Sequence, residues 1–400
     1  MTESAAPGTE ELPSGYFQDP LAYFARMRAK GPVTPVAMPE GNRAWMITGY
    51  PEVRAALADP RLAKDWIGKL TPEGFEPDPV TGYLGVHLLN ADPPGHTRLR
   101  KLVTKAFTAR RVAGLRPRIE EITASLLDEM SGRETVDLIE AFAFPLPITV
   151  ICELLGIPAA DRDEFKSWSH AIVSSVATRE EFMSAGTAMF HYFTDLVAAK
   201  RRSPSGDLVS ALIEARDSGD SLDERELLAM MFLLLVAGHE TTTNLIASGT
   251  LALLTHPAEL DRLRADWSLL PAAVEELLRY SNPLNHATER FTTEPVTIGG
   301  VTIPAREVVL CVTSSGNRDP SRFPDPDRLD LGRDATGHLS FGHGIHYCLG
   351  APLARLEGEV AFRALLSRYP SLALAVPESS LRWRSSSLIH GLETLQVRLR

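Results

Sequence analysis

The sequence predicts a mainly α-helical fold with small β-sheets. Six segments in the first half of the chain show apolar residues at helical spacing, often after an acidic residue or a proline. Strand signals are short and gather within residues 296–312. No long linker or low-complexity tract divides the 400 residues. We therefore expect a single domain over residues 15–400, preceded by a disordered N-terminus at residues 1–14.

The predicted helices of the first half are separated by one long interruption. Residues 64–90 contain several glycines and prolines and show no stable period, so we expect a long loop there, and such loops often act as lids. The helices themselves are predicted at residues 20–30, 51–58, 94–106, 112–130, 159–176 and 180–202.

A long helix is predicted in the centre of the chain. Ser221 and Glu224 fit a capping box, and the helical pattern continues to His256, about 50 Å at about 1.5 Å per residue. Its apolar run at residues 227–238 is far shorter than the roughly 20 residues that span a bilayer. Within residues 237–242, a mid-helix glycine costs about 1 kcal/mol relative to alanine, and a carboxylate interrupts a buried face. We expect a function to offset these costs.

The strand signals and a final helix follow. Val296–Ile298 and Val301–Ile303 flank two glycines, a pair suited to a two-residue hairpin, and a further strand is predicted at residues 308–312. Residues 351–369 read as an amphipathic helix with a proline in its first turn.

Charge and cysteine content exclude several classes of protein. The formal net charge of -10 argues against nucleic acid as a partner, because phosphate binding needs a basic surface. Three cysteines form an odd and sparse set, which fits a reducing cytoplasm better than a disulfide framework. The N-terminal residues lack the basic and apolar regions of a secretory signal. We expect a cytoplasmic protein without a membrane anchor.

The segment at residues 341–350 is the most informative in the sequence. Its three glycines let the backbone approach a bulky flat ligand, and the predicted helix after it places Cys348 near a helix N-terminus, which favours a thiolate. A thiolate is a haem ligand that promotes O–O cleavage. Two other interpretations remain: Cys348 as a small buried hydrophobe, and a zinc or iron site made by His338, His343, His346 and Cys348. A covalently attached haem is disfavoured because no C-x-x-C-H motif exists.

Phe341, Gly344, His346, Cys348 and Gly350 realise the pattern Phe-x-x-Gly-x-His-x-Cys-x-Gly, which resembles the haem-binding signature of cytochromes P-450. The resemblance covers residues 17–399 and is closest to soluble actinobacterial members that hydroxylate macrolides, other polyketides, vitamin D or sterol-like molecules. It implies the P-450 fold, a single triangular-prism domain, with haem b (iron protoporphyrin IX) held by Cys348. It also implies a monooxygenase that uses dioxygen and two electrons to hydroxylate or epoxidise a bulky apolar secondary metabolite.

The same resemblance assigns roles to residues outside this segment. Glu240 and Thr241 match the acid and alcohol that organise water and deliver protons to dioxygen. His96 and Arg100, spaced i,i+4 on one helix face, match a pair that binds haem propionates, as do Arg290 and His346. Glu276, Arg279 and Arg328 match a buried network that supports folding. The full set of expected cofactor contacts is His96, Arg100, Ala237, Arg290, Phe341, Gly342, His346, Cys348 and Gly350.

Redox partners and a substrate pocket complete these expectations. Residues 97–118 contain eight basic residues and no acidic one, a patch suited to an acidic redox partner. The resemblance implies a ferredoxin with a reductase that draws on NAD(P)H, because no flavin- or nicotinamide-binding fingerprint appears. We expect a monomer. The expected substrate pocket is lined by Leu88, Leu89, Val236, Ala237, Leu284, His286, Leu388 and Ile389, with His286 either a polar anchor or a structural residue.

Two other functions remain open at this point. The first is a haem-binding sensor or ligand-binding protein without oxygenase turnover, which the presence of both Glu240 and Thr241 disfavours. The second is a non-haem metal hydrolase that uses the histidine cluster around Cys348.

Overall fold

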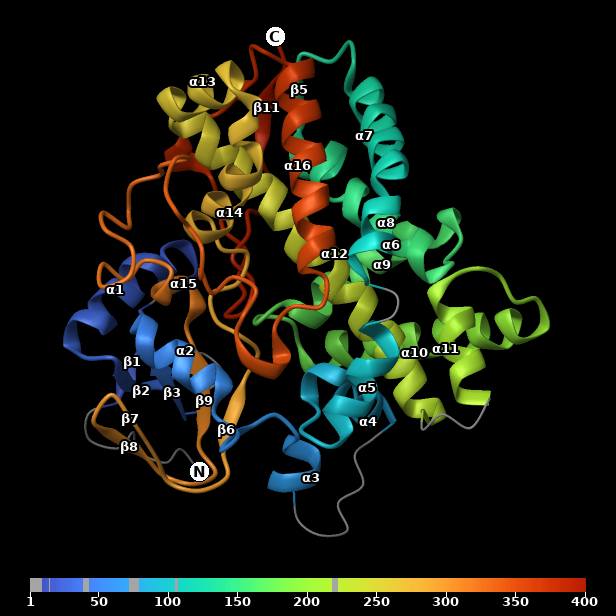
Figure 1. Ribbon diagram of the computed structural model, residues 1–400, viewed down its shortest axis with the longest axis vertical. Coiled ribbons are helices and arrows are strands. Elements are labelled where there is room, and N and C mark those ends of the chain that lie inside the picture. The colour runs from blue at the N-terminus through green and yellow to red at the C-terminus, as the bar shows by residue number, and fades with distance from the viewer. Residues whose placement is uncertain (1–8, 14, 39–42, 72–78, 105–106, 218–221) are drawn as a thin grey trace. The chain divides into compact units, whose positions relative to one another are not determined.

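The computed structural model describes residues 9–13, 15–38, 43–71, 79–104, 107–217 and 222–400 (Figure 1). These residues are mainly helical with small sheets, which confirms the predicted fold class. The chain divides into two compact units made of interleaved segments. Unit 1 comprises Met1–Lys64, Ser248–Cys348 and Ser380–Glu393, and unit 2 comprises Asp65–Ala247, Leu349–Ser379 and Thr394–Arg400.

Unit 1 is built on a six-stranded sheet with the order β1-β2-β3-β9-β6-β4. The β1–β2 and β3–β9 pairs are parallel and the other three pairs are antiparallel. A separate hairpin, β7–β8, has the predicted bounds. The strands are β1 Glu10–Glu11, β2 Val33–Ala37, β3 Arg43–Ile47, β4 Leu62–Ala63, β6 Arg290–Thr292, β7 Val296–Ile298, β8 Val301–Ile303 and β9 Val308–Cys311.

Both faces of the six-stranded sheet are covered. Along β3, Trp45 and Ile47 pack in one core cluster with residues of α2, while Ala44 and Met46 pack in another with residues of α1. Successive strand residues point to opposite faces, so this division follows from the period of two. The helices of unit 1 are α1 Pro20–Lys30, α2 Tyr50–Ala58, α13 Pro257–Ala265, α14 Leu270–Tyr280 and α15 Thr313–Gly316.

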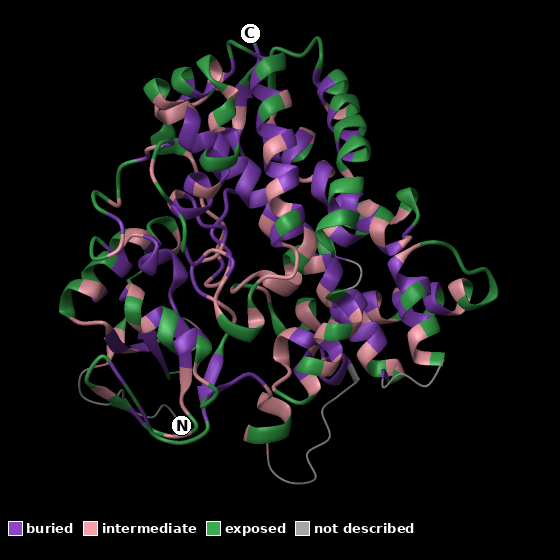
Figure 2. Ribbon diagram, viewed as in Figure 1, coloured by how far each residue is buried: buried purple, intermediate pink, exposed green. Residues whose placement is uncertain are grey.

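Unit 2 is largely helical. Its helices α7 and α16 run side by side (Figure 1). Tyr369 follows α16, and its hydroxyl donates to the Leu127 carbonyl of α7 at 2.7 Å. Much of α16 is buried (Figure 2). Unit 2 contains α3 Trp66–Leu70, α4 Pro79–Gly85, α5 Gly95–Thr104, α6 Ala109–Gly114, α7 Arg116–Met130, α8 Pro145–Leu155, α9 Arg162–Val173, α10 Arg179–Arg202, α11 Leu208–Asp217 and α16 Ala351–Arg368. Its sheet has the order β10-β11-β5, with β5 Thr135–Asp137, β10 Ala373–Leu374 and β11 Gln396–Arg398.

The central helix α12, Glu224–Thr255, contributes to both units. Its capping box begins two residues later than predicted: Asp223 accepts a hydrogen bond from the Glu226 amide at 2.7 Å, and Glu226 accepts one from the Asp223 amide at 3.1 Å. Ser221 lies outside the described residues. Among those residues, α12 and every other helix is too short or too polar to serve as a membrane span.

Three local expectations need correction. Residues 64–90 are not a continuous loop, because α3, α4 and the 3₁₀ turn Leu88–Asn90 form there. The expected helix over 112–130 is two helices, since Pro117 lacks an amide donor and occupies the first turn of a new helix, α7. Glu10–Glu11 pairs with β2, although residues 1–14 were expected to be disordered; residues 1–8 and 14 lie outside the described ranges.

Candidate functional site

The segment around Cys348 is a tight loop in unit 1. The Cys348 amide donates to the Phe341 carbonyl at 2.9 Å, and the Tyr347 amide donates to the Gly344 carbonyl at 3.1 Å. Gly342 and Gly344 have φ angles of 71° and 76°, which favour glycine. A Cβ on Gly344 would lie 2.9 Å from the Leu57 carbonyl oxygen, so no side chain fits there. The loop therefore requires glycine for its close approach to α2.

The structure describes all three cysteines, and Cys348 differs from the other two in its burial. Cys348 is half-buried, whereas Cys152 and Cys311 are fully buried. Burial raises the pKa of the Cys152 thiol to about 12 and that of the Cys311 thiol to about 11. Those two thiols are buried and hard to ionise, so the more accessible Cys348 is the candidate ligand. Gly350, two residues later, is the N-cap of α16 and accepts a hydrogen bond from the Ala354 amide at 2.9 Å.

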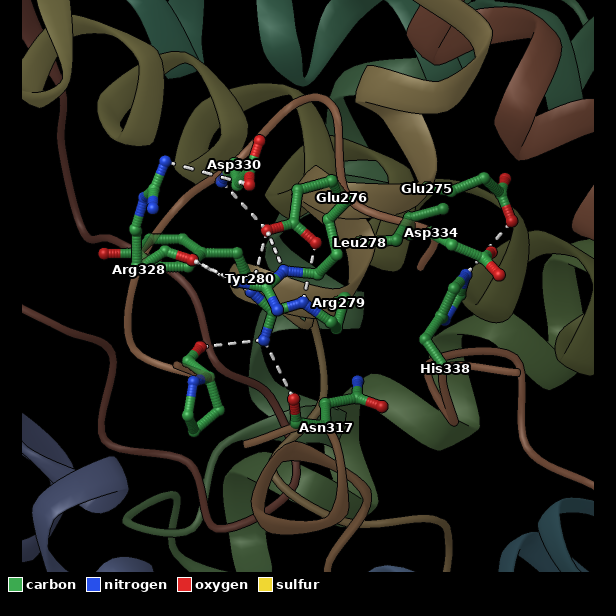
Figure 3. Close-up of polar contacts among 12 residues, drawn as sticks. Glu275, Glu276, Leu278, Arg279, Tyr280, Asn317, Arg328, Asp330, Asp334 and His338 are labelled. Carbon is green, nitrogen blue, oxygen red and sulfur yellow. Dashed lines mark hydrogen bonds and ion pairs between the residues drawn. The ribbon is translucent and has the colours of Figure 1, made fainter. Parts of the chain in front are cut away.

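The alternative metal site does not assemble. In the part of the chain that the structure describes, no group of three histidine, cysteine or acidic side chains could hold a metal ion. His338 instead lies 3.2 Å from the Glu275 carboxylate through its Nε2 atom (Figure 3). This removes the geometric basis for a zinc site or a non-haem hydrolase around Cys348.

In unit 2, the central part of α12 presents a short accessible strip. Ala237 is exposed, and Val236, Gly238 and Thr241 are half-buried, although the helix is otherwise mostly buried. The Thr241 hydroxyl donates to the Ala237 carbonyl at 3.0 Å. Gly238 has a packing role that the sequence did not reveal, because a Cβ there would lie 2.8 Å from the Ile151 side chain of α8. The small residue Ala237 thus lies on the accessible side of this turn, and Gly238 allows its close contact with α8.

Glu240 lies on the same turn of α12 and is only 7% exposed. One carboxylate oxygen lies 3.8 Å from Nε2 of His239, and His239 Nδ1 lies 2.8 Å from the Leu235 carbonyl. The Asn244 side-chain amide donates to the Glu240 backbone carbonyl at 2.7 Å. The acid, the alcohol and the accessible strip therefore share one turn of α12.

Of the four residues predicted to hold propionates, two lie in each unit. His96 is buried on α5, where burial lowers its pKa and the Arg100 charge lowers it further. This coupling agrees with the two side chains sharing a helix face. Arg290 is buried at the start of β6 and donates to the Leu62 carbonyl at 3.0 Å. His346 is half-buried in the 3₁₀ turn Gly344–His346.

The predicted pocket residues form two local groups. In unit 1, Leu284 and Ile389 form a β-bridge, and the Asn285 amide donates to the Leu388 carbonyl at 2.8 Å. His286 of this group is 2% exposed, with its Nδ1 atom 2.8 Å from the Ala287 carbonyl, which favours the structural interpretation.

The second group lies in unit 2. The Leu88 amide contacts the Met230 sulfur of α12 at 3.3 Å, with Leu89 beside it and Val236 and Ala237 further along that helix.

The buried network of unit 1 differs from the prediction in one residue. Glu276 and Arg279 are both fully buried and form two hydrogen bonds of 2.6 and 2.8 Å (Figure 3). Arg328 supplies only its carbonyl, because its side chain is 65% exposed and reaches toward Asp330. Arg333 completes the network instead, with Nε 3.2 Å from Glu276 and its side chain only 11% exposed. No sequence signal pointed to Arg333.

The basic stretch between His96 and Arg118 is partly neutralised. Arg98 pairs with Glu226, Arg116 with Glu359 at 2.9 Å, and Arg118 with Glu153 at 2.8 Å. Lys101, Arg110 and Arg111 are exposed, and Lys105 lies outside the described residues. The accessible patch is therefore smaller than the sequence suggested.

Comparison with known proteins is consistent over nearly the whole chain. Residues 177–384 match the family model described as cytochrome P450. The chain is 51% identical to cytochrome P450 107B1 of Saccharopolyspora erythraea, over 100% of this chain and 99% of that protein. It is 47% identical to the 6-deoxyerythronolide B hydroxylase of the same organism, over 94% of this chain and 95% of that protein. The structure of the tirandamycin C-bound P450 monooxygenase TamI superposes with a TM-score of 0.92 at 50% identity, covering 98% of this chain and 100% of TamI.

Proposed function

The chain belongs to the cytochrome P450 family and is a monooxygenase, and on that premise we propose that it oxidises a bulky apolar secondary metabolite. The proposed substrate is a macrolide, another polyketide or a sterol-like compound, and the proposed reaction is hydroxylation or epoxidation. One similar protein is named for 6-deoxyerythronolide B, and the similar TamI structure contains tirandamycin C. The apolar residues Leu88, Leu89, Val236, Leu284, Leu388 and Ile389 suit such a ligand.

The residues around Cys348 fit a haem. The accessible cysteine precedes the N-terminus of α16, and glycines leave the loop backbone open to a flat ligand. This selection of Cys348 over two buried thiols is the observation that carries the proposal. We infer that Cys348 is the iron ligand, with Phe341, Gly342, Gly350 and Ala237 as further contacts.

His96, Arg100, Arg290 and His346 are the proposed partners of the two haem carboxylates. His96 is a proposed hydrogen-bond donor, while Arg100 and Arg290 supply charge. Buried carboxylates are very costly without such partners.

The haem, when bound, supplies the activation of dioxygen with two electrons. The proposed task of Glu240 and Thr241 is to hold and pass protons beside the accessible strip of α12. Thr241 donates its own proton to the Ala237 carbonyl, which leaves its oxygen lone pairs available to accept one from water. Glu240 is nearly buried and is the proposed acid that returns a proton to the water bound by Thr241.

The proposed electron source is a ferredoxin with a reductase that uses NAD(P)H. The exposed Lys101, Arg110 and Arg111 favour a partner with an acidic surface. The same proposal includes a cytoplasmic location, which the sparse cysteines favour, and a monomeric state.

The experiment has two parts. A panel of macrolactones, linear polyketides and sterols is added to the purified protein, and the expected result is a Soret shift with at least one class, followed by conversion with ferredoxin, reductase and NAD(P)H. Cys348→Ala should abolish the thiolate-type Soret band of the reduced carbon-monoxide complex, while the matched Cys311→Ala should retain it. An unchanged spectrum in Cys348→Ala would overturn the ligand assignment.

A further inference from the structure

Two buried cations face each other where β4 pairs with β6 in unit 1. The antiparallel register places Leu62 opposite Thr292 and Ala63 opposite Phe291, so the next position sets Lys64 opposite Arg290. Side chains opposite each other in an antiparallel pair lie on one face, with Cβ atoms about 4.5–5.5 Å apart. Lys64 is 3% exposed and Arg290 is 6% exposed.

The ammonium group of Lys64 is fixed to the backbone just before Arg290. It donates to the Thr288 carbonyl at 3.1 Å, to the Glu289 carbonyl at 3.0 Å and to the Thr288 hydroxyl. Lys64 holds residues 288–289 through these hydrogen bonds and brings a positive charge to the segment.

The two charges act on the same neighbour. Burial raises the pKa of the Cys311 thiol, and both Arg290 and Lys64 oppose this rise. Asp59, whose carboxylate also feels the Arg290 charge, is bound by Arg61 at 2.7 and 3.0 Å. Both cations therefore favour a negative charge in this neighbourhood, as they would favour the thiolate form of Cys311.

We propose that Lys64 is a positioning residue for the haem: it holds the segment that carries Arg290 and adds a second positive charge beside the haem carboxylate assigned to Arg290. This inference rests on the proposed haem-binding function. Positive charge near the haem disfavours the ferric state relative to the ferrous state. Lys64 should therefore raise the reduction potential as well as slow the release of haem.

The test compares the holoenzymes of three variants with the wild type. Lys64→Gln removes the charge but keeps an amide that can donate to the backbone carbonyls, and Lys64→Arg keeps the charge. Arg61→Gln is the matched control, because it removes one positive charge from the same segment at a side chain that is 45% exposed. The measurements are the one-electron midpoint potential and the rate of haem transfer to apomyoglobin.

Lys64→Gln should release haem roughly tenfold faster and shift the one-electron equilibrium roughly tenfold toward ferric haem, about 59 mV to more negative potential. Lys64→Arg should recover at least half of both effects, and Arg61→Gln should stay close to wild type. Equal values in Lys64→Gln and Arg61→Gln would overturn the inference while the proposed function stands. A wild-type protein without a thiolate-type haem spectrum would instead overturn the proposed function.

If Lys64→Gln yields no folded protein, Thr288→Val decides the question, since it removes one acceptor of Lys64 and keeps the charge. Faster haem release with an unchanged midpoint potential would support the proposal. Haem release at the wild-type rate would overturn it.

Discussion

Thr241 has a single hydroxyl proton, and the structure directs it to the Ala237 carbonyl. This back-bond is common for threonine in helices and does not by itself indicate function. What distinguishes Thr241 is its position on the accessible strip of α12, next to the nearly buried Glu240. The residue is therefore held in place by the helix while its oxygen remains able to accept a hydrogen bond.

Thr241→Ala should keep haem and substrate binding but divert electrons from product to peroxide or water. Loss of one positioned group in a proton relay typically costs about a hundredfold in the step it serves. The measurement is the amount of product formed per NAD(P)H consumed, with peroxide assayed in parallel. Thr241→Ser, which keeps the hydroxyl, is the control and should recover most of the coupling. Wild-type coupling in Thr241→Ala would contradict the proton-relay role.

At the residue scale, the sequence supplied motifs but few contacts. Its glycine-rich surroundings distinguished Cys348 from the other cysteines, and the i,i+4 spacing of His96 and Arg100 places both on one helix face. Arg333 could not be selected, because its contact with Glu276 depends on the path of an irregular segment. Arg328 was chosen by its place in a pattern, yet its side chain is mostly exposed.

Among the helices, α14 supports the irregular segment after residue 317. Arg279 of α14 donates to the carbonyls of Asn317, Pro326 and Arg328, while Glu276 accepts from the Asp330 amide and from Arg333. A helix thus satisfies backbone groups that a segment without regular structure leaves unpaired.

Arg333→Gln should destabilise the protein much more than Arg328→Gln. Arg333 bonds the Glu276 carboxylate and the carbonyls of residues 324, 325 and 328, so its removal leaves a buried charge partly unpaired, at a cost of roughly 3 kcal/mol. The exposed Arg328 side chain should contribute within about 0.5 kcal/mol. Chemical denaturation of both variants provides the comparison. A larger loss in Arg328→Gln would contradict the assignment of Arg333 to the network.

Element prediction depended on whether a segment has one buried face. The helices α1 and α10 were found because their polar faces create a period. Strands β2 and β3 were missed, since β3 is buried on both faces and shows no alternation of polar and apolar residues. Residues 64–90 were misjudged because short helices there are stabilised by packing: His87 stacks on Phe232 of α12, and Tyr83 contacts the same ring.

For the whole molecule, one buried histidine links stability to pH. His390 stacks on Trp383 with ring centroids 4.3 Å apart, and burial lowers its pKa from 6.5 to about 4. The unfolded chain binds this proton more readily than the folded one between those values. Stability from His390 is therefore complete above about pH 6.5 and is lost as the pH falls toward 4.

His390→Phe should keep the stacking and remove this titration. Between pH 7 and pH 5, wild-type stability should fall by about 2 kcal/mol more than that of the variant, because each tenfold excess in the proton affinity of the unfolded chain is worth about 1.4 kcal/mol. Urea unfolding at the two pH values measures the difference, and other titrating groups cancel because both proteins contain them. Parallel losses in the two proteins would show that His390 does not carry the effect.

The fold class and the family followed from local patterns, but the division into two units did not. Segment 380–393 belongs to unit 1 although the residues on both sides of it belong to unit 2. Periodicity reports how a segment is buried and not which distant segment covers it. Only long-range pairing, such as β3 with β9, reveals that arrangement.

The sheet of unit 2 has β11 as its central strand, between β10 and β5. The Leu395 amide that precedes β11 bonds Asp137 across 258 residues of sequence. During synthesis, β5 emerges from the ribosome long before its neighbour in this sheet exists. The edge of β5 stays unpaired until residues 396–398 have been synthesised. Closing the long loop between β5 and β11 then slows folding. Until then the edge of β5 is a site where a chaperone, or a second nascent chain, could pair with it.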